Sequence, residues 1–124
     1  HVLPIMRKNK FGRIIFMSSV VAQTGFIGAS AYAASKAGLF GLVKTISKEV
    51  ANKGITINAV ALGYFNAGMI EDVPQSMQDE LKKNIPVSAL GKPEELGELI
   101  KYIISDKSSY LTGQTINLNG GLYV

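Results

Sequence analysis

Two residues that could move a proton stand four positions apart in this sequence. Tyr32 and Lys36 lie within the stretch SAYAASKAG (residues 30–38), which continues into a longer helical pattern. A spacing of four places both side chains on one face of a helix. A free phenol has a pKa near ~10, and an ammonium group held close to a phenol favours its ionised form. The pair could therefore exchange a proton with a substrate oxygen, although ordinary surface pairs have the same spacing.

A short apolar run ending in hydroxyl groups precedes this pair. Residues 13–19 read RIIFMSS, and a loop with two glycines follows them. A continuous apolar run of this length is typical of a strand buried on both faces, as in a parallel sheet. Ser19 at the end of the strand could bring a hydroxyl group to the same substrate oxygen. A serine in this place can also simply cap the backbone, so both interpretations stay open.

A long helix is predicted for residues 31–52, because its apolar side chains recur at spacings of three and four. Gly54 follows as a C-cap. The face expected to be buried consists of Leu39, Leu42, Val43, Ile46 and Val50.

The order of the remaining elements predicts an α/β fold. A second strand is expected at 55–62 (ITINAVAL), a weak helical pattern at 75–84, a helix opening at Pro93, and a third strand within 113–121. Strands alternating with helices favour a doubly wound, Rossmann-like parallel sheet. Ligands bind beyond the carboxyl ends of the strands in such sheets. Ser18, Ser19 and the segment after Leu62 are expected at those ends.

The composition limits the classes of function. The chain has 124 residues, of which 47% are hydrophobic and 18% charged, which is typical of one soluble globular domain over 1–124. No apolar run approaches the ~20 residues of a membrane-spanning helix, and no secretory signal pattern is visible. Cysteine is absent and no zinc spacing occurs, so we expect no metal site and a cytoplasmic protein. Nucleic acid is a poor fit despite the net charge of +4.

Several motifs together resemble one family. The segments GRIIFMSSVVAQTG, AYAASKAGLFGLVKTISKEVANKGITINAVALG and LTGQTINLNGG follow the order and spacing of the C-terminal half of a short-chain dehydrogenase/reductase. Within that family the sequence is most similar to the bacterial 3-oxoacyl-[acyl-carrier-protein] reductases. The resemblance covers residues 11–63 and 91–121. It favours the catalytic interpretation of Tyr32 and Lys36 over that of a surface pair.

The resemblance implies a role for each matching residue. Ser19, rather than its neighbour Ser18, would bind and polarise the substrate carbonyl. Tyr32 would be the general acid that protonates the ketone oxygen. Lys36 would hold the nicotinamide ribose and lower the pKa of the tyrosine in this position of the family. Gly63 and the backbone of Phe65 would contact the cofactor, with Phe65 at the nicotinamide carboxamide.

Two positions depart from the family pattern, and one glycine pair is ambiguous. Leu62 stands where the family usually has proline, and Ala67 stands where it usually has a threonine that touches the cofactor. Losing one hydroxyl contact is expected to weaken cofactor binding by about 0.5–1.5 kcal/mol. Gly120 and Gly121 match the family's Asn-Gly-Gly segment, but a tight turn with close backbone packing explains them equally well.

The glycine-rich turn that cradles a dinucleotide pyrophosphate is not found in this sequence. The chain opens with HVLPIMRKNK, which resembles the last turns of a helix already under way. We therefore expect the fold to lack its N-terminal half, which would hold the residues that discriminate NADP from NAD. NADP is the expected cofactor, with NAD as the alternative.

The resemblance implies reduction of a 3-oxoacyl thioester, carried by acyl carrier protein or coenzyme A, in fatty acid synthesis. The alternatives are another reductase of the family, acting on acetoacetyl-coenzyme A, a sugar or an alcohol, and a binding protein or fragment without catalysis. A homotetramer is also implied, and small residues at Ala33, Ala37, Gly38 and Gly41 permit close helix approach. Basic residues before the first strand and near the end of the long helix could attract an acidic carrier protein: Arg7, Lys8, Lys10, Arg13, Lys48 and Lys53.

Overall fold

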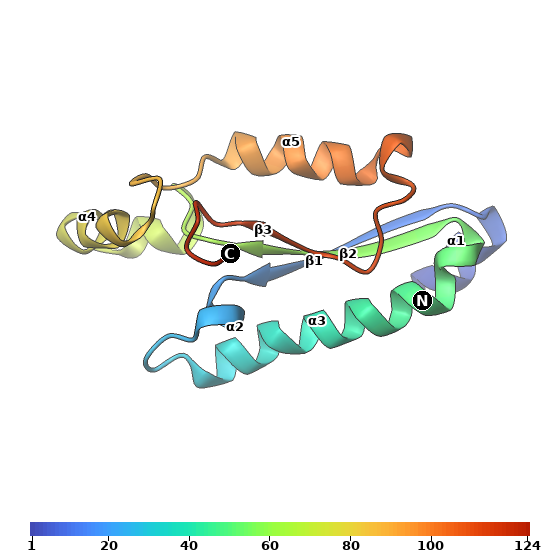
Figure 1. The fold of residues 1–124 in the computed structure, drawn as a ribbon, viewed down its shortest axis with the longest axis horizontal. Coiled ribbons are helices and arrows are strands. Elements are labelled where there is room, and N and C mark those ends of the chain that lie inside the picture. Colours follow the sequence, from blue (N-terminus) through green and yellow to red (C-terminus); the bar gives the residue numbers. More distant parts are fainter.

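Three parallel strands form the sheet of this protein. In the computed structural model, which describes residues 1–124, they are β1 (Gly12–Ser19), β2 (Ile55–Leu62) and β3 (Thr115–Leu118), in the order β1-β2-β3 (Figure 1). The first pair runs in register from Gly12 opposite Ile55 to Ser19 opposite Leu62. The predicted α/β fold with a parallel sheet is confirmed.

The central strand is the one that is fully buried. Residues 55–61 of β2 are all buried, whereas residues 13–17 of β1 are only half-buried. The expectation that residues 13–19 are buried on both faces is therefore met only at Ser18 and Ser19. The reason is topological, because β1 has a neighbouring strand on one side only.

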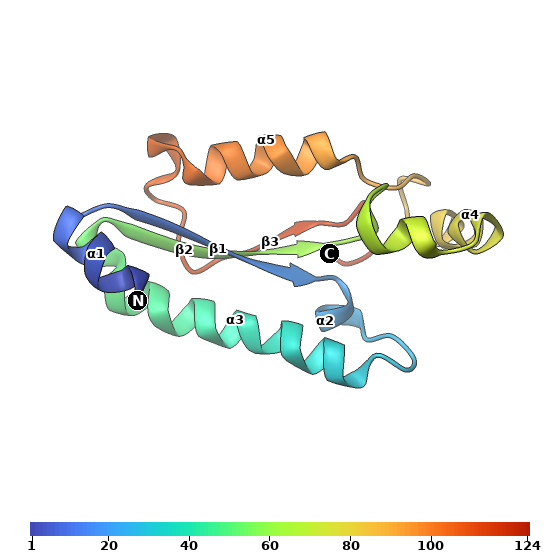
Figure 2. The same cartoon turned by 180° about the vertical axis from the view of Figure 1, so that it is seen from behind.

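Helices cover both faces of the sheet. The long helix α3 (Ser30–Val50) lies along one face with α1 (Val2–Asn9), and α5 (Pro93–Ile104) lies along the other (Figures 1 and 2). The remaining helical elements are short: α2 (Val21–Thr24), η1 (Ala51–Lys53), η2 (Gly68–Asp72), α4 (Gln75–Asn84) and η3 (Asp106–Ser108). No helix is both long and apolar enough to cross a membrane.

The main core lies between α3 and β2. Val43 and Val50 of α3 pack with Ile55, Ile57 and Ala59, and all five are buried. Burying a side chain of this size contributes about 1.5–3 kcal/mol each. This contact fixes α3 along the sheet and so sets where its first turn lies.

The buried face of α3 is narrower than the sequence indicates. Leu42 was expected to face the core, but its exposed fraction is 40%. Successive helical residues are rotated by about 100°, and the buried residues of α3 are Val43, Ser47 and Val50. Leu42 therefore lies at the side of the helix.

Helix α5 begins where the sequence predicts. Pro93 takes the first helical position, where its missing N–H breaks no hydrogen bond. The Glu95 carboxylate accepts a hydrogen bond of 2.8 Å from the backbone N–H of Lys92, and acidic groups favour the positive end of the helix dipole.

Because the strands are parallel, the sheet has two distinct ends. We call the end that contains Ser19, Leu62 and Leu118 the carboxyl edge, near α2 and α4, and the end that contains Gly12 and Ile55 the amino edge (Figure 1).

Candidate active site

A cavity of about 730 Å³ opens at the carboxyl edge. Ser19 from the end of β1 and both Tyr32 and Lys36 from the start of α3 contribute to its wall. The segment after β2 also lines it, with Gly63 and Phe65. The structure therefore brings together all the residues that the sequence singled out for this site.

Lys36 is held in place by the backbone of β1. Its Nζ donates a hydrogen bond of 2.9 Å to the carbonyl oxygen of Met17. The same Nζ lies 5.8 Å from the centre of the Tyr32 ring. A lysine ammonium has three donors, so the contact with Met17 leaves further N–H groups for a ligand.

Tyr32 lies in the first turn of α3 and remains accessible, with an exposed fraction of 39%. Its position follows from the packing of α3, whose later turns are fixed against β2. The spacing of four residues predicted that Tyr32 and Lys36 share a face of the helix, and both side chains line the same cavity.

The two serines at the end of β1 have different hydrogen-bond partners. Ser18 is buried and donates its hydroxyl proton to the carbonyl oxygen of Lys36, at 3.0 Å. The Oγ of Ser19 accepts a hydrogen bond of 3.2 Å from the backbone N–H of Val21. Ser19 therefore keeps its own hydroxyl proton for another acceptor, whereas Ser18 ties β1 to α3.

The backbone at Gly63 packs directly against the end of β3. Its N–H donates to the carbonyl oxygen of Leu118 at 2.9 Å. A Cβ at this position would lie 2.7 Å from the Cα of Asn119, so only glycine fits without movement. Gly120 and Gly121 have φ angles of +64° and +89°, which supports the tight-turn interpretation of this pair.

The backbone of Phe65 offers an unused donor and acceptor. On one side of it the carbonyl oxygen of Tyr64 accepts a hydrogen bond from Gly91, and on the other the N–H of Asn66 donates to Gly91, each at 2.9 Å. The N–H and C=O of Phe65 itself take part in none of the backbone hydrogen bonds. One donor beside one acceptor is the complement of a primary amide such as a carboxamide.

Sequence reasoning missed the apolar wall of the cavity. It is formed mainly by residues of the stretch that the sequence left irregular: Met69, Ile70, Val73, Met77 and Leu81. Only Met77 and Leu81 lie in α4, four residues apart, which is the spacing of one helical face and was a usable signal for these two. Met69 and Ile70 lie in η2, and Val73 follows it in an extended conformation. Burial raises the pKa of Tyr64, which also lines this cavity, above its usual value.

A parallel sheet covered by helices, with a serine, a tyrosine and a lysine gathered at the carboxyl ends of its strands, is the architecture of the short-chain dehydrogenase/reductases. A family model described as "Enoyl-(Acyl carrier protein) reductase" matches residues 1–123, and the chain belongs to this family of short-chain dehydrogenase/reductases.

Curated relatives carry a more specific name. The chain is 44% identical over 123 residues to "3-oxoacyl-[acyl-carrier-protein] reductase FabG" of Thermotoga maritima, covering 99% of this chain and 50% of the relative. It is 43% identical over 117 residues to the protein of the same name from Rickettsia felis, covering 94% of this chain and 48% of that protein. "Nodulation protein G" of Azospirillum brasilense is 39% identical over 121 residues, with 98% and 49% covered. The chain thus spans about half the length of the curated relatives it matches.

Proposed function

We propose that this chain carries the proton-transfer site of an enzyme that reduces 3-oxoacyl thioesters, typically 3-oxoacyl-[acyl-carrier-protein], to 3-hydroxyacyl thioesters with a nicotinamide cofactor. The observation that carries the proposal is the joint position of Ser19, Tyr32 and Lys36 in one cavity at the carboxyl edge. The name shared by relatives at 43–44% identity supports the substrate class. The reaction belongs to fatty acid synthesis, in the cytoplasm.

The residues present fit the nicotinamide end of such a cofactor. The donors of Lys36 that are not bound to Met17 suit the hydroxyl groups of a ribose. The free N–H and C=O of Phe65 suit a carboxamide, and Gly63 allows close backbone approach. When bound, the cofactor supplies the hydride. We name NADP first and keep NAD as the alternative. The residues described above contact the nicotinamide end of the cofactor, which is the same in both, so they do not distinguish NADP from NAD.

The chain's own groups would then handle the substrate oxygen. Ser19 would donate its hydroxyl proton as a hydrogen bond to the ketone oxygen and polarise the carbonyl group. Tyr32 would transfer its phenolic proton to that oxygen as the negative charge develops there. Lys36, next to the ring of Tyr32, would stabilise the phenolate left behind, because an ammonium group favours a nearby anion. The apolar wall would limit water at the reacting carbonyl.

The composition of the cavity favours an acyl substrate over a sugar. Met69, Ile70, Val73 and Met77 present aliphatic surface, which suits a hydrocarbon chain. A related reductase acting on another substrate is the alternative within the family, since the segment 63–92 would shape substrate choice. A non-catalytic binding protein is the second alternative, which Leu62 and Ala67 support by departing from the family pattern at the cofactor side.

The proposed function is tested by assaying the complete gene product with NADPH and NADH. The substrates are acetoacetyl thioesters of acyl carrier protein and of coenzyme A, together with a sugar ketone as a control. We expect oxidation of the cofactor with a thioester and formation of the 3-hydroxy product. Cofactor binding without turnover of any of them would favour the binding-protein alternative.

We propose that the substrate is carried by acyl carrier protein, an acidic protein that Lys10 and Lys53 at the amino edge would attract. Lys10 is the C-cap residue of α1, and its carbonyl group packs against Gly54. Since Gly54 is the neighbour of Lys53 in the sequence, the two lysines lie close together. Long-range attraction between a basic patch and an acidic protein raises the rate of association. Because β1 has eight residues, the patch lies about 25 Å from the carboxyl edge, so the acyl arm must cover that length or reach the site of a second copy.

A homotetramer is proposed as the assembly. Gly38 and Gly41 on α3 are exposed, and a Cβ built at either would meet open space. Small residues in such a position let another helix approach closely. Sedimentation of the complete gene product tests this part of the proposal, with a monomer as the contrary result.

A further inference from the structure

The stretch between β2 and α5 returns to its own starting point. Phe65 and Gly91 form an isolated parallel bridge, although 26 positions separate them in the sequence. Gly91 donates its N–H to the carbonyl oxygen of Tyr64 and accepts from the N–H of Asn66. The residues between them include the apolar wall of the large cavity, so this bridge closes the base of that wall.

The ring of Phe65 fills the space that a side chain at position 91 would occupy. A Cβ at Gly91 would be 2.9–3.0 Å from three atoms of the ring, Cε1, Cδ1 and Cζ. The φ angle of Gly91 is not in the left-handed region, so alanine is compatible with its backbone. The three atoms nearest to such a Cβ all belong to the ring of Phe65, so this ring is the first obstacle to a larger residue at position 91.

Phe65 is shared between two cavities. Tyr64 and Phe65 line both the cavity of about 730 Å³ and a second one of about 380 Å³ on the α5 side. A displaced ring would therefore change the wall of the candidate active site.

We propose that Gly91 is a positioning residue: its two hydrogen bonds and its lack of a side chain hold Phe65 in the wall of the large cavity, where the free N–H and C=O of Phe65 would bind the nicotinamide carboxamide. The proposal rests on the proposed function for the identity of the ligand, but not for the existence of the contact. A changed cavity wall would misplace the nicotinamide, and misplacement of a reacting group by about 1 Å can lower a rate by up to about 10²-fold.

The test uses Gly91→Ala, Phe65→Leu and the double variant in the complete gene product, with Gly97→Ala as the matched control. Gly97 lies in α5, and a Cβ there would meet no atom within 4 Å. For Gly91→Ala we expect kcat to fall about tenfold or more and the NADPH Kd to rise by about fivefold, the effect of losing roughly one hydrogen bond. The KM of the thioester should change little.

Two further readouts separate a positioning role from a general loss of structure. Hydrogen exchange at the amide of Asn66, which bonds to Gly91, should become faster in Gly91→Ala and stay unchanged in Gly97→Ala. In the Phe65→Leu background the same change at position 91 should have a clearly smaller effect, because a shorter side chain removes the collision.

Unchanged exchange at Asn66 in Gly91→Ala would overturn the contact itself. An equal effect of Gly91→Ala with phenylalanine or leucine at position 65 would overturn the role of the ring. If the wild-type protein binds neither NADPH nor NADH, the proposed function is wrong, and so is the cofactor part of this inference. The exchange data then still decide whether Gly91 holds Phe65.

Discussion

The two edges of the sheet use their cationic side chains in opposite ways. At the carboxyl edge Lys36 donates to one carbonyl oxygen, that of Met17, and lies in the wall of a large cavity. At the amino edge Arg13 donates to the carbonyl oxygens of Gly12, Gly54 and Ser105, and its guanidinium lies 4.6 Å from the centre of the Phe11 ring. A cation with several backbone partners holds the fold together, whereas a cation with donors to spare can hold a ligand.

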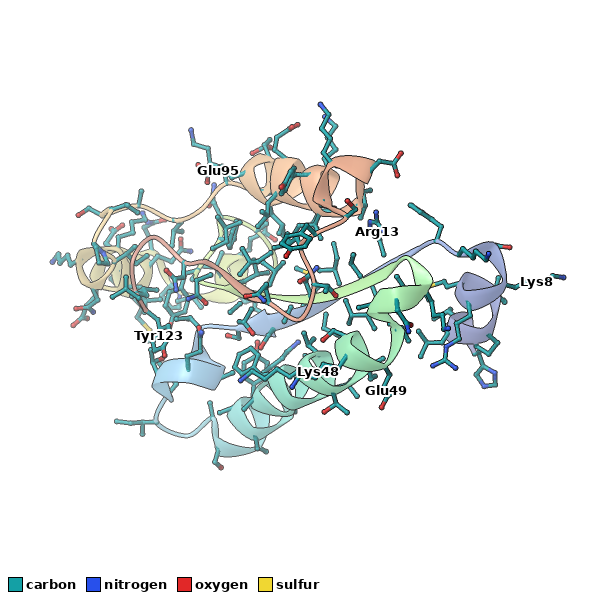
Figure 3. All side chains as sticks on the ribbon, turned by 45° about the vertical axis from the view of Figure 1, so that its right-hand side comes forward. Lys8, Arg13, Lys48, Glu49, Glu95 and Tyr123 are labelled. Atoms are coloured by element: carbon teal, nitrogen blue, oxygen red, sulfur yellow. The ribbon has the colours of Figure 1, made fainter.

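One residue of the basic cluster predicted from the sequence is not available to a partner. Arg13 is half-buried and bound to backbone carbonyl groups, so it is not a free surface charge. Figure 3 shows Lys8 at the opposite end of the molecule from Tyr123, whereas Arg13 lies between them, beside the end of α5. The other basic residues of the cluster are exposed and remain available to an acidic partner: Arg7, Lys8, Lys10, Lys48 and Lys53. Lys10 and Lys53 flank the starts of β1 and β2.

The largest effect is expected from Lys36→Ala at the carboxyl edge. We expect kcat/KM to fall by at least about 10³-fold, since acid–base catalysis alone supplies about 10²–10⁴-fold and the proposed ribose contact is lost as well. Cofactor binding should weaken in parallel. Lys101→Ala is the control, because Lys101 is an exposed lysine paired only with Glu98. Equal activity of the two variants would contradict the role given to Lys36.

At the amino edge, Arg13→Gln should affect stability rather than chemistry. The change removes charge-assisted hydrogen bonds that join the starts of β1 and β2 to the segment after α5. We expect a loss of about 1–3 kcal/mol in the free energy of unfolding, measured by urea denaturation, with kcat preserved at temperatures where the variant is folded. A variant as stable as the wild type would show that these contacts contribute nothing.

A smaller effect is expected from reversing the charges of Lys10 and Lys53 to glutamate. The KM for a carrier-linked thioester should rise about three- to tenfold, because exposed charge pairs contribute about 0.2–1 kcal/mol each, and added salt should have the same effect on the wild type. Lys83→Glu is the matched control, since Lys83 is an exposed lysine of α4 near the carboxyl edge.

A substrate without a carrier protein shows whether the charge reversal acts on docking of the carrier protein. A coenzyme A thioester should be affected much less than the carrier-linked one. A larger effect of Lys83→Glu than of the double reversal would place the carrier protein at the carboxyl edge instead.

The strands and the shared helical face of Tyr32 and Lys36 could be predicted from the sequence because their signals are local. The run ITINAVAL at 55–62 is apolar throughout, and it forms β2 with the predicted bounds. Tyr32 and Lys36 are four apart on a helix whose pattern is clear over several turns. Pro93 with two acids likewise marked the start of α5.

What could not be predicted depends on contacts between distant segments. The role of Gly91 depends on its contact with the ring of Phe65. The role of Arg13 depends on its hydrogen bonds to the carbonyl groups of Gly54 and Ser105. The helix α2 has four residues, which is too short for a periodic signal. Leu42 fits the apolar pattern, but the exact rotation of α3 against the sheet leaves it exposed.

The central claim is that the phenol of Tyr32 delivers the proton in this site. Tyr32→Phe in the complete gene product tests it most directly, because phenylalanine keeps the ring beside Lys36 and removes only the hydroxyl group. The measurement is kcat for acetoacetyl-thioester reduction together with the Kd of NADPH. We expect reduction to be abolished, with kcat below about a tenth of the wild-type value at the least, and a nearly unchanged Kd. A variant that keeps more than a tenth of the wild-type kcat would contradict the claim.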